Sequence, residues 1–177
     1  HVGLLPNEDF QSINVDATEQ LALVGIKMGV KQFIFTSTTA LYGYASTPEH
    51  TAGWVNEQIT PQPKTVYHRS KIAAEAKLKN ISNVLGLPVT VLQMSRCFPE
   101  PADLMAVYRL TRGIDARDVA SAHLAALETC LAGFNRFIVS GRTPFVESDC
   151  PRLLNDVGGL IQEKVPELAE VFLERGW

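Results

Sequence analysis

Two side chains that could perform acid–base chemistry stand one helical turn apart near the middle of the sequence. Tyr67 and Lys71 lie in Val66–Leu78, a run of mostly helix-forming residues, and a helix would place both side chains on one face. A phenol has an unperturbed pKa of roughly 10, so it is a poor base at neutral pH. A nearby ammonium favours the phenolate and lowers that pKa. The spacing therefore predicts an acid/base tyrosine whose pKa is lowered by Lys71.

A Tyr-x-x-x-Lys pair is weak support on its own. With four Tyr and seven Lys in 177 residues, a chance pair is expected at roughly the 0.2 level. The competing interpretation is an ordinary helix with a half-buried tyrosine and a solvated lysine. The choice between them depends on the elements that would position the pair.

Strand-like and helix-like segments alternate along the chain. Near-continuous apolar runs predict strands near residues 31–37, 89–94 and 136–140. Helices are predicted at 7–28, 66–85 and 116–131, the first capped by Asn7 and the last by Asp115, and the tail from residue 149 is predicted to be helical with a break near Pro166. This alternation predicts an α/β fold with a doubly wound parallel sheet, Rossmann-like, in a single domain over residues 1–177.

Polar residues follow the first two predicted strands. In open α/β sheets, ligands bind beyond the carboxyl ends of the strands. Thr36–Thr39 end the first strand, Ser95–Phe98 follow the second, and a long loop over residues 38–65 joins the first strand to the helix of Tyr67. We therefore expect the hydroxyls, the phenol and the Lys71 ammonium to converge on one crevice. The alternative for the threonines is simple β-propensity and a hydroxyl-capped turn.

Composition excludes several classes of partner. The formal net charge of −3 and the lack of a Lys/Arg run argue against nucleic acid. The apolar stretches fall short of the roughly eighteen residues that would span a membrane. The three cysteines are widely spaced, which suits reduced thiols in the cytoplasm, and the four histidines show no metal-ligand spacing, so no metal site is predicted.

Four segments carry further motifs, in this order along the chain. Asn14–Thr18 reads Asn-Val-Asp-Ala-Thr, Phe33–Gly43 is a strand-like run with Ser/Thr residues and a Tyr-Gly turn, Tyr67–Lys71 reads Tyr-x-x-Ser-Lys, and Arg112–Ala120 leads into a helix with Asp-Val. Together they resemble the extended branch of the short-chain dehydrogenase/reductases, the branch of sugar-nucleotide epimerases and dehydratases. The first segment is similar to that family's Asn-Val-x-Gly-Thr helix, with Ala17 in place of Gly.

The resemblance implies a role for each matching position. Tyr67 would be the catalytic acid/base, and Lys71 would lower its pKa and bond the nicotinamide ribose. Thr38 would polarise the substrate hydroxyl or carbonyl, with Ser37 as the competing choice. Asn14 would be a structural or proton-relay residue. A hydride would pass between C4 of the nicotinamide and a substrate carbinol carbon while Tyr67 takes or returns the hydroxyl proton.

The implied cofactor is NAD or NADP. The residues expected to contact it are Ser37, Tyr67, Lys71, Ser95, Arg96 and Phe98. The expected substrate is a small molecule, such as a nucleotide sugar. The resemblance also implies a homodimer through the helices at 7–28 and 66–85.

Two features depart from the family pattern. Sugar-nucleotide 4,6-dehydratases carry Asp-Glu after the catalytic Thr, whereas Thr39-Ala40 stands here, which leaves epimerase-like or reductase-like chemistry. The sequence also contains no glycine-rich dinucleotide fingerprint. His1-Val2-Gly3 resembles the end of the family's fourth strand, so we expect a longer natural protein in which these residues form the catalytic portion. The isolated portion is expected to be inactive.

These observations predict an NAD(P)-dependent epimerase or reductase. The alternative is a non-catalytic dinucleotide-binding regulator or scaffold that kept the fold. The enzyme is favoured by the presence of Tyr67, Lys71 and Thr38, because a binding module does not need a phenol whose pKa is lowered.

Overall fold

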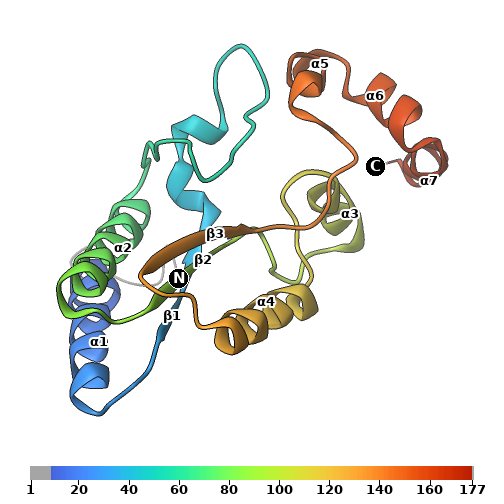
Figure 1. Ribbon diagram of the computed structural model, residues 1–177. Coiled ribbons are helices and arrows are strands. Elements are labelled where there is room, and N and C mark those ends of the chain that lie inside the picture. Colours follow the sequence, from blue (N-terminus) through green and yellow to red (C-terminus); the bar gives the residue numbers. More distant parts are fainter. Residues whose placement is uncertain (1–8, 177) are drawn as a thin grey trace.

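A parallel three-stranded sheet forms the centre of the fold (Figure 1). The structure is a computed structural model that describes residues 9–176. The strand order is β1-β2-β3. The strands pair in register over their full length, so their carboxyl ends, at Thr38, Met94 and Val139, lie at one edge. The strand bounds are β1 (Phe33–Thr38), β2 (Val89–Met94) and β3 (Phe134–Val139).

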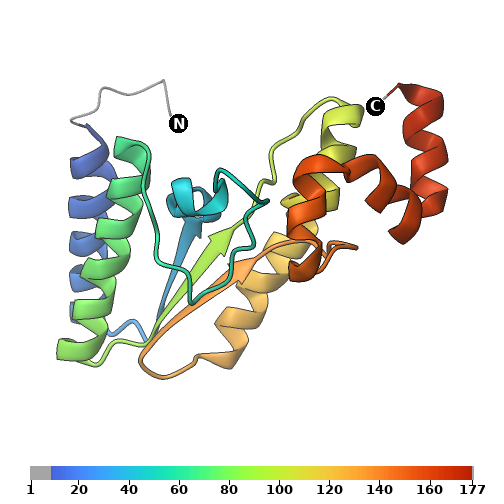
Figure 2. The ribbon, with the colours of Figure 1, turned by 90° about the horizontal axis from the view of Figure 1, so that it is seen from above.

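Helices cover both faces of this sheet. Helices α1 and α2 lie side by side on one face, and α4 lies on the other (Figures 1 and 2). Helices α5 to α7 lie beside α3, away from the sheet (Figure 2). The helix bounds are α1 (Ala17–Lys27), α2 (Val66–Leu85), α3 (Ala102–Thr111), α4 (Ala116–Thr129), α5 (Cys150–Asn155), α6 (Val157–Lys164) and α7 (Pro166–Arg175).

The end signals of α2 are local. The Thr65 hydroxyl accepts a hydrogen bond from the His68 N–H at 3.2 Å and caps the first turn. Gly86 takes the left-handed conformation at φ +72° and ends the helix. Because both signals lie in the sequence, the helix spans the predicted residues.

The main core lies between the two helices on one face and the sheet. The apolar stripes of α1 and α2 pack on β2, which is buried along most of its length. This explains why β2 is a continuous apolar run rather than an alternating one. The buried members of this cluster are Ala22, Leu78, Ile81, Leu87, Val89 and Val91.

The observed strands and helices confirm the predicted α/β fold and correct it in places. Helix α3 was not predicted, because the flanking prolines of Pro99–Pro101 suggested an irregular segment, whereas Pro101 stands just before the helix and leaves it intact. The tail forms three helices, and the segment before α1 is a π-helix, Gln11–Asp16. The cap at Asn7 and the strand end at His1–Gly3 lie outside the described residues. No helix within residues 9–176 is long and apolar enough to cross a membrane.

Candidate active site

Thr38 and Tyr67 meet at the carboxyl end of β1. Thr38 is the last residue of the strand, and its hydroxyl accepts a hydrogen bond from the Ala40 N–H at 3.1 Å. Tyr67 is the second residue of α2, and the Thr38 side chain lies close enough to its phenol to affect the pKa of that phenol. The convergence expected from topology therefore holds for this pair, because a parallel strand and the start of the following helix share one edge of the sheet.

Burial governs the acidity of the Tyr67 phenol. Its pKa is raised above the ordinary value because burial disfavours the phenolate, and the Thr38 side chain opposes this shift. The Phe10 ring packs edge-on against the Tyr67 ring, with centroids 6.0 Å apart, and contributes to this apolar environment. The phenol is therefore a proton donor at neutral pH.

Lys71 contacts β1 in this structure, and its expected effect on the pKa of Tyr67 stays a prediction. Its ammonium donates a hydrogen bond to the Thr36 carbonyl at 2.8 Å and lies 4.2 Å from the centre of the Phe35 ring. The helical spacing brings the two residues to one face, but the long lysine side chain is drawn to the strand. Burial lowers the pKa of Lys71, and the Glu75 carboxylate opposes that shift.

Asn14 is joined to the start of α2. Its side-chain amide donates to the Ser70 hydroxyl at 3.0 Å, and that hydroxyl donates to the Tyr67 carbonyl at 2.9 Å. Asn14 lies in the π-helix that precedes α1, and π-helical turns are frequent at functional sites. The contact supports the structural role among the two roles expected for Asn14.

Ser37 faces away from Thr38. Successive residues of a strand point to opposite faces of the sheet, and the buried Ser37 hydroxyl donates to Glu75 Oε1 at 2.5 Å. The expectation that Ser37 contacts the cofactor, or replaces Thr38 as the polarising hydroxyl, stays a prediction, although this hydroxyl already donates to Glu75. Its hydroxyl forms a hydrogen bond in the interface between β1 and α2.

The residues after β2 lie at the same edge of the sheet. Ser95 is buried, whereas Phe98 is 58 % exposed. The Arg96 guanidinium lies over the Tyr108 ring, 4.6 Å from its centre, and pairs with Glu100. Arg96 thus contacts α3, and contact between this segment and a nicotinamide stays a prediction.

The turn after the Thr38 segment requires a glycine. Gly43 has φ +54°, and a Cβ at this position would lie 2.0 Å from the Gln62 carbonyl oxygen. The close approach pins the end of the long loop beside the turn, where the Tyr44 N–H donates to that carbonyl at 2.9 Å. The loop is therefore anchored immediately before α2 begins.

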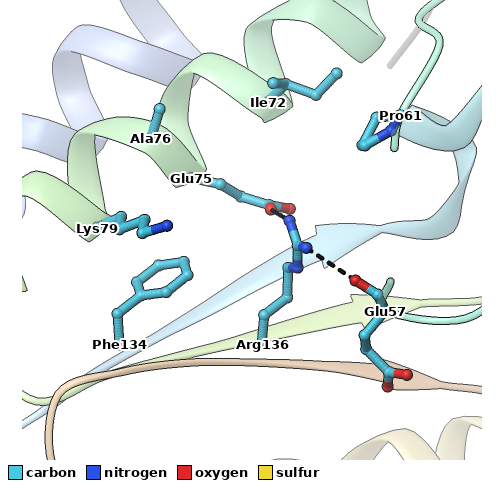
Figure 3. Close-up of a pocket in the computed structure, with 8 residues that line it drawn as sticks. All are labelled: Glu57, Pro61, Ile72, Glu75, Ala76, Lys79, Phe134 and Arg136. Carbon is cyan, nitrogen blue, oxygen red and sulfur yellow. Dashed lines mark hydrogen bonds and ion pairs between the residues drawn. The ribbon is translucent and has the colours of Figure 1, made fainter. Parts of the chain in front are cut away.

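A pocket of about 410 Å³ lies beside this site, between α2, β3 and the long loop (Figure 3). The Arg136 guanidinium spans it, 3.6 Å from Glu75 Oε2 and 3.2 Å from the Glu57 carbonyl. The Glu57 carboxylate accepts a hydrogen bond from the Ile138 N–H of β3 at 2.9 Å. Thr38, Tyr67 and Lys71 are not among the residues that line this pocket.

Sequence reasoning missed the polar residues behind the site, chiefly Glu75, Gln93 and Arg136. One signal could have found Glu75. It stands three residues before Leu78 on the stripe of α2 that faces the core, where a charged residue needs a buried partner. Its partners come from separate strands, so spacing alone could not identify them.

Comparison with known proteins identifies the family. The model of the NAD dependent epimerase/dehydratase family matches residues 2–101, more than half of the chain. The chain belongs to this family. The assignment confirms the resemblance inferred from the motifs.

Individual relatives are distant. An uncharacterized protein of Sinorhizobium fredii, y4nG, is 27 % identical over 84 residues, which are 48 % of this chain and 20 % of that protein. The UDP-Glc/GlcNAc 4-epimerase of Campylobacter jejuni is 25 % identical, with a TM-score of 0.56 over 72 % of this chain and 49 % of its own. The dTDP-glucose 4,6-dehydratase of Streptomyces venezuelae, solved with NAD and TYD bound, is 18 % identical. Its TM-score is 0.61, and the match covers 75 % of this chain and 46 % of that protein's chain. The chain thus spans about half the length of these solved relatives.

Proposed function

We propose that this chain carries the catalytic residues of an NAD- or NADP-dependent oxidoreductase or epimerase. The observation that supports the proposal most directly is the meeting of the Thr38 and Tyr67 side chains at the carboxyl end of β1, with Lys71 one turn along α2. The chain's family, in which the Streptomyces relative binds NAD, supports the cofactor.

The residues present fit a nicotinamide ribose. An ammonium has three N–H donors, and the bond from Lys71 to the Thr36 carbonyl uses one of them. Lys71 is half-buried on α2, one turn after Tyr67, and its ammonium lies against β1 with donors left for a ribose hydroxyl. Lys71 and Tyr67 would hold the ribose, and the nicotinamide would supply hydride transfer to or from a substrate carbon.

The chain's own part in the reaction is to move one proton. In the reductive direction, the protonated Tyr67 phenol donates its proton to the carbonyl oxygen as the carbon gains a hydride. The Thr38 hydroxyl donates a hydrogen bond to that same oxygen and polarises the carbonyl. In the oxidative direction, the Tyr67 phenolate accepts the proton from the carbinol.

A nucleotide sugar is the substrate class that we propose. The named epimerase and dehydratase relatives act on this class, and Thr39-Ala40 argues against the dehydration reaction. The experiment is to incubate the full-length natural protein with NAD or NADP and a panel of uridine and thymidine diphosphate sugars. We expect a 4-epimer or a 4-keto product from at least one of them, measured by chromatography. If none is converted with either cofactor, the substrate class is wrong.

We also propose that the protein is a homodimer through α1 and α2, whose outer faces carry exposed apolar side chains. Among them, Leu21 is 63 % exposed and Val24 50 % exposed. Leu21→Glu should weaken dimerisation by about 30-fold, as expected for loss of about 2 kcal/mol at an interface. Sedimentation equilibrium measures this. The matched control, Leu173→Glu on α7, places the same charge on a residue 78 % exposed and should leave the dimer intact. A monomeric wild type would contradict the proposal.

The free thiols bear on the compartment. Cys97, Cys130 and Cys150 are all unpaired. This suits the reducing cytoplasm, which we propose as the location. Because Cys150 is buried, the test is alkylation in denaturant directly after lysis, and a disulfide found at any of the three would argue against it.

A further inference from the structure

A buried carboxylate joins α2 to every strand of the described sheet. Glu75 is 5 % exposed. Its oxygens accept hydrogen bonds from the Ser37 hydroxyl of β1 at 2.5 Å and from the Gln93 amide of β2 at 3.0 and 3.1 Å. The Arg136 guanidinium of β3 lies 3.6 Å from Glu75 Oε2 (Figure 3).

The partners of Glu75 are themselves held in place. The Gln93 side-chain oxygen accepts a hydrogen bond from the Tyr42 hydroxyl at 2.9 Å, and both Gln93 and Tyr42 are fully buried. A buried charge is costly unless it is paired and hydrogen-bonded. The network supplies these contacts, so the Glu75 carboxylate is confined to one position.

Glu75 connects the helix and the strand that carry the candidate site residues. It lies one turn after Lys71 on α2, about 6 Å along the helix axis. Its partner Ser37 is the neighbour of Thr38 on β1. The bond between Ser37 and Glu75 therefore joins the helix that carries Tyr67 and Lys71 to the strand that carries Thr38.

We propose that Glu75 is a positioning residue for the reaction, because it fixes α2, which carries Tyr67 and Lys71, against β1, which ends at Thr38. The inference rests on the proposed function for its kinetic consequence. It differs from a purely structural role because the same carboxylate also acts on the charge of Lys71.

The charge effect follows from what faces Lys71. On its own helix the nearby charged group is the Glu75 carboxylate, and from β1 it meets the Thr36 carbonyl and the Phe35 ring. Arg136 of β3 faces Glu75 rather than Lys71. Burial lowers the pKa of Lys71 and Glu75 raises it. Removing the carboxylate should therefore let the Lys71 ammonium lose its proton at lower pH.

The first test is Glu75→Gln in the full-length natural protein. We expect kcat to fall by about 10²-fold, the scale of a small misplacement of catalytic groups, with the cofactor KM changed by less than about threefold. The matched control is Glu19→Gln, because Glu19 pairs with Lys77 of α2 at 3.0 Å on the other side of the helix without reaching the sheet. Equal losses in the two variants, or kcat within twofold of wild type for Glu75→Gln, would overturn the proposal.

The second test needs no turnover. NMR titration of the Lys71 side chain in the free protein, assigned with Lys71→Arg, should show its pKa at lower pH in Glu75→Gln and unchanged in Glu19→Gln. An unchanged titration in both variants would overturn the proposal. Because this readout is independent of activity, a wild type without hydride transfer would refute the proposed function alone.

A milder pair of variants covers the case in which Glu75→Gln does not fold. Ser37→Ala removes only the bond to β1 and leaves Glu75 with Gln93 and Arg136. We expect kcat to fall by about tenfold, less than in Glu75→Gln, because Glu75 keeps its other partners. Ser37→Thr keeps the hydroxyl and should restore most of the loss. Full activity in Ser37→Ala would contradict a positioning role.

Discussion

Tyr67→Phe in the full-length natural protein should lower kcat for hydride transfer by about 10²–10⁴-fold, the usual contribution of a general acid or base. The phenylalanine keeps the ring packed against Phe10 and removes only the hydroxyl that lies near Thr38. Nucleotide binding should weaken by less than about tenfold, because only one of the expected hydrogen bonds to the ribose is lost and Lys71 remains. The measurement pairs steady-state turnover, followed by nicotinamide absorbance, with cofactor titration by calorimetry.

The matched control is Tyr44→Phe. This tyrosine is 60 % exposed, and its ring lies 4.7 Å from the Lys64 ammonium, a contact that phenylalanine retains. Its activity should match the wild type. If Tyr67→Phe is fully active, the mechanism fails. If the wild type binds the dinucleotide without turnover, the non-catalytic regulator or scaffold becomes the better description.

The pH profile gives the Tyr67 experiment a second readout. The group titrates from phenol to phenolate, and burial raises its pKa above the ordinary value of 10.0. The phenolate fraction therefore increases about tenfold per pH unit below that pKa. Oxidation of a carbinol should accelerate accordingly across the alkaline range, and the increase should disappear in Tyr67→Phe. A flat wild-type profile would exclude the phenolate as the base.

Leu78→Ala should lower the free energy of unfolding by about 2–5 kcal/mol, the range for a buried leucine. Leu78 is fully buried in the cluster between α1, α2 and the sheet, and its loss leaves a cavity in that cluster. Denaturant unfolding of the protein measures the difference. The comparison is Val84→Ala on the same helix, where the side chain is 69 % exposed and the change should stay within about 0.5 kcal/mol. A loss below about 1 kcal/mol in Leu78→Ala would contradict the packing.

The helices and strands that were predicted most accurately are those whose ends or burial are marked by local sequence signals. The hydroxyl of Thr65, the left-handed Gly86 and the apolar run Val89–Met94 are all visible in the sequence, and each marks the boundary or the burial that the structure shows. Helix α3 was missed because prolines before a segment were interpreted as breakers, although a proline before the first turn is compatible with a helix.

In the candidate site, too, some features follow from local sequence and others depend on the tertiary structure. Sequence order and the topology of parallel sheets were sufficient to place Thr38 and Tyr67 at one edge, because both lie at element ends. The face on which Ser37 points depends on strand register, and the acceptor that Lys71 binds depends on which carbonyl lies within its reach. Neither follows from spacing along the chain.

By itself, therefore, the sequence determined the α/β order, the family motifs and the identity of the residues that could transfer a proton. Only the tertiary structure decided how those residues are charged and held. Burial raises the pKa of Tyr67, and the Lys71 ammonium donates a hydrogen bond to the Thr36 carbonyl of β1. Glu75 contacts side chains from three strands. The physical reason is that desolvation and buried hydrogen bonds depend on residues that are distant in sequence and meet only in the folded chain.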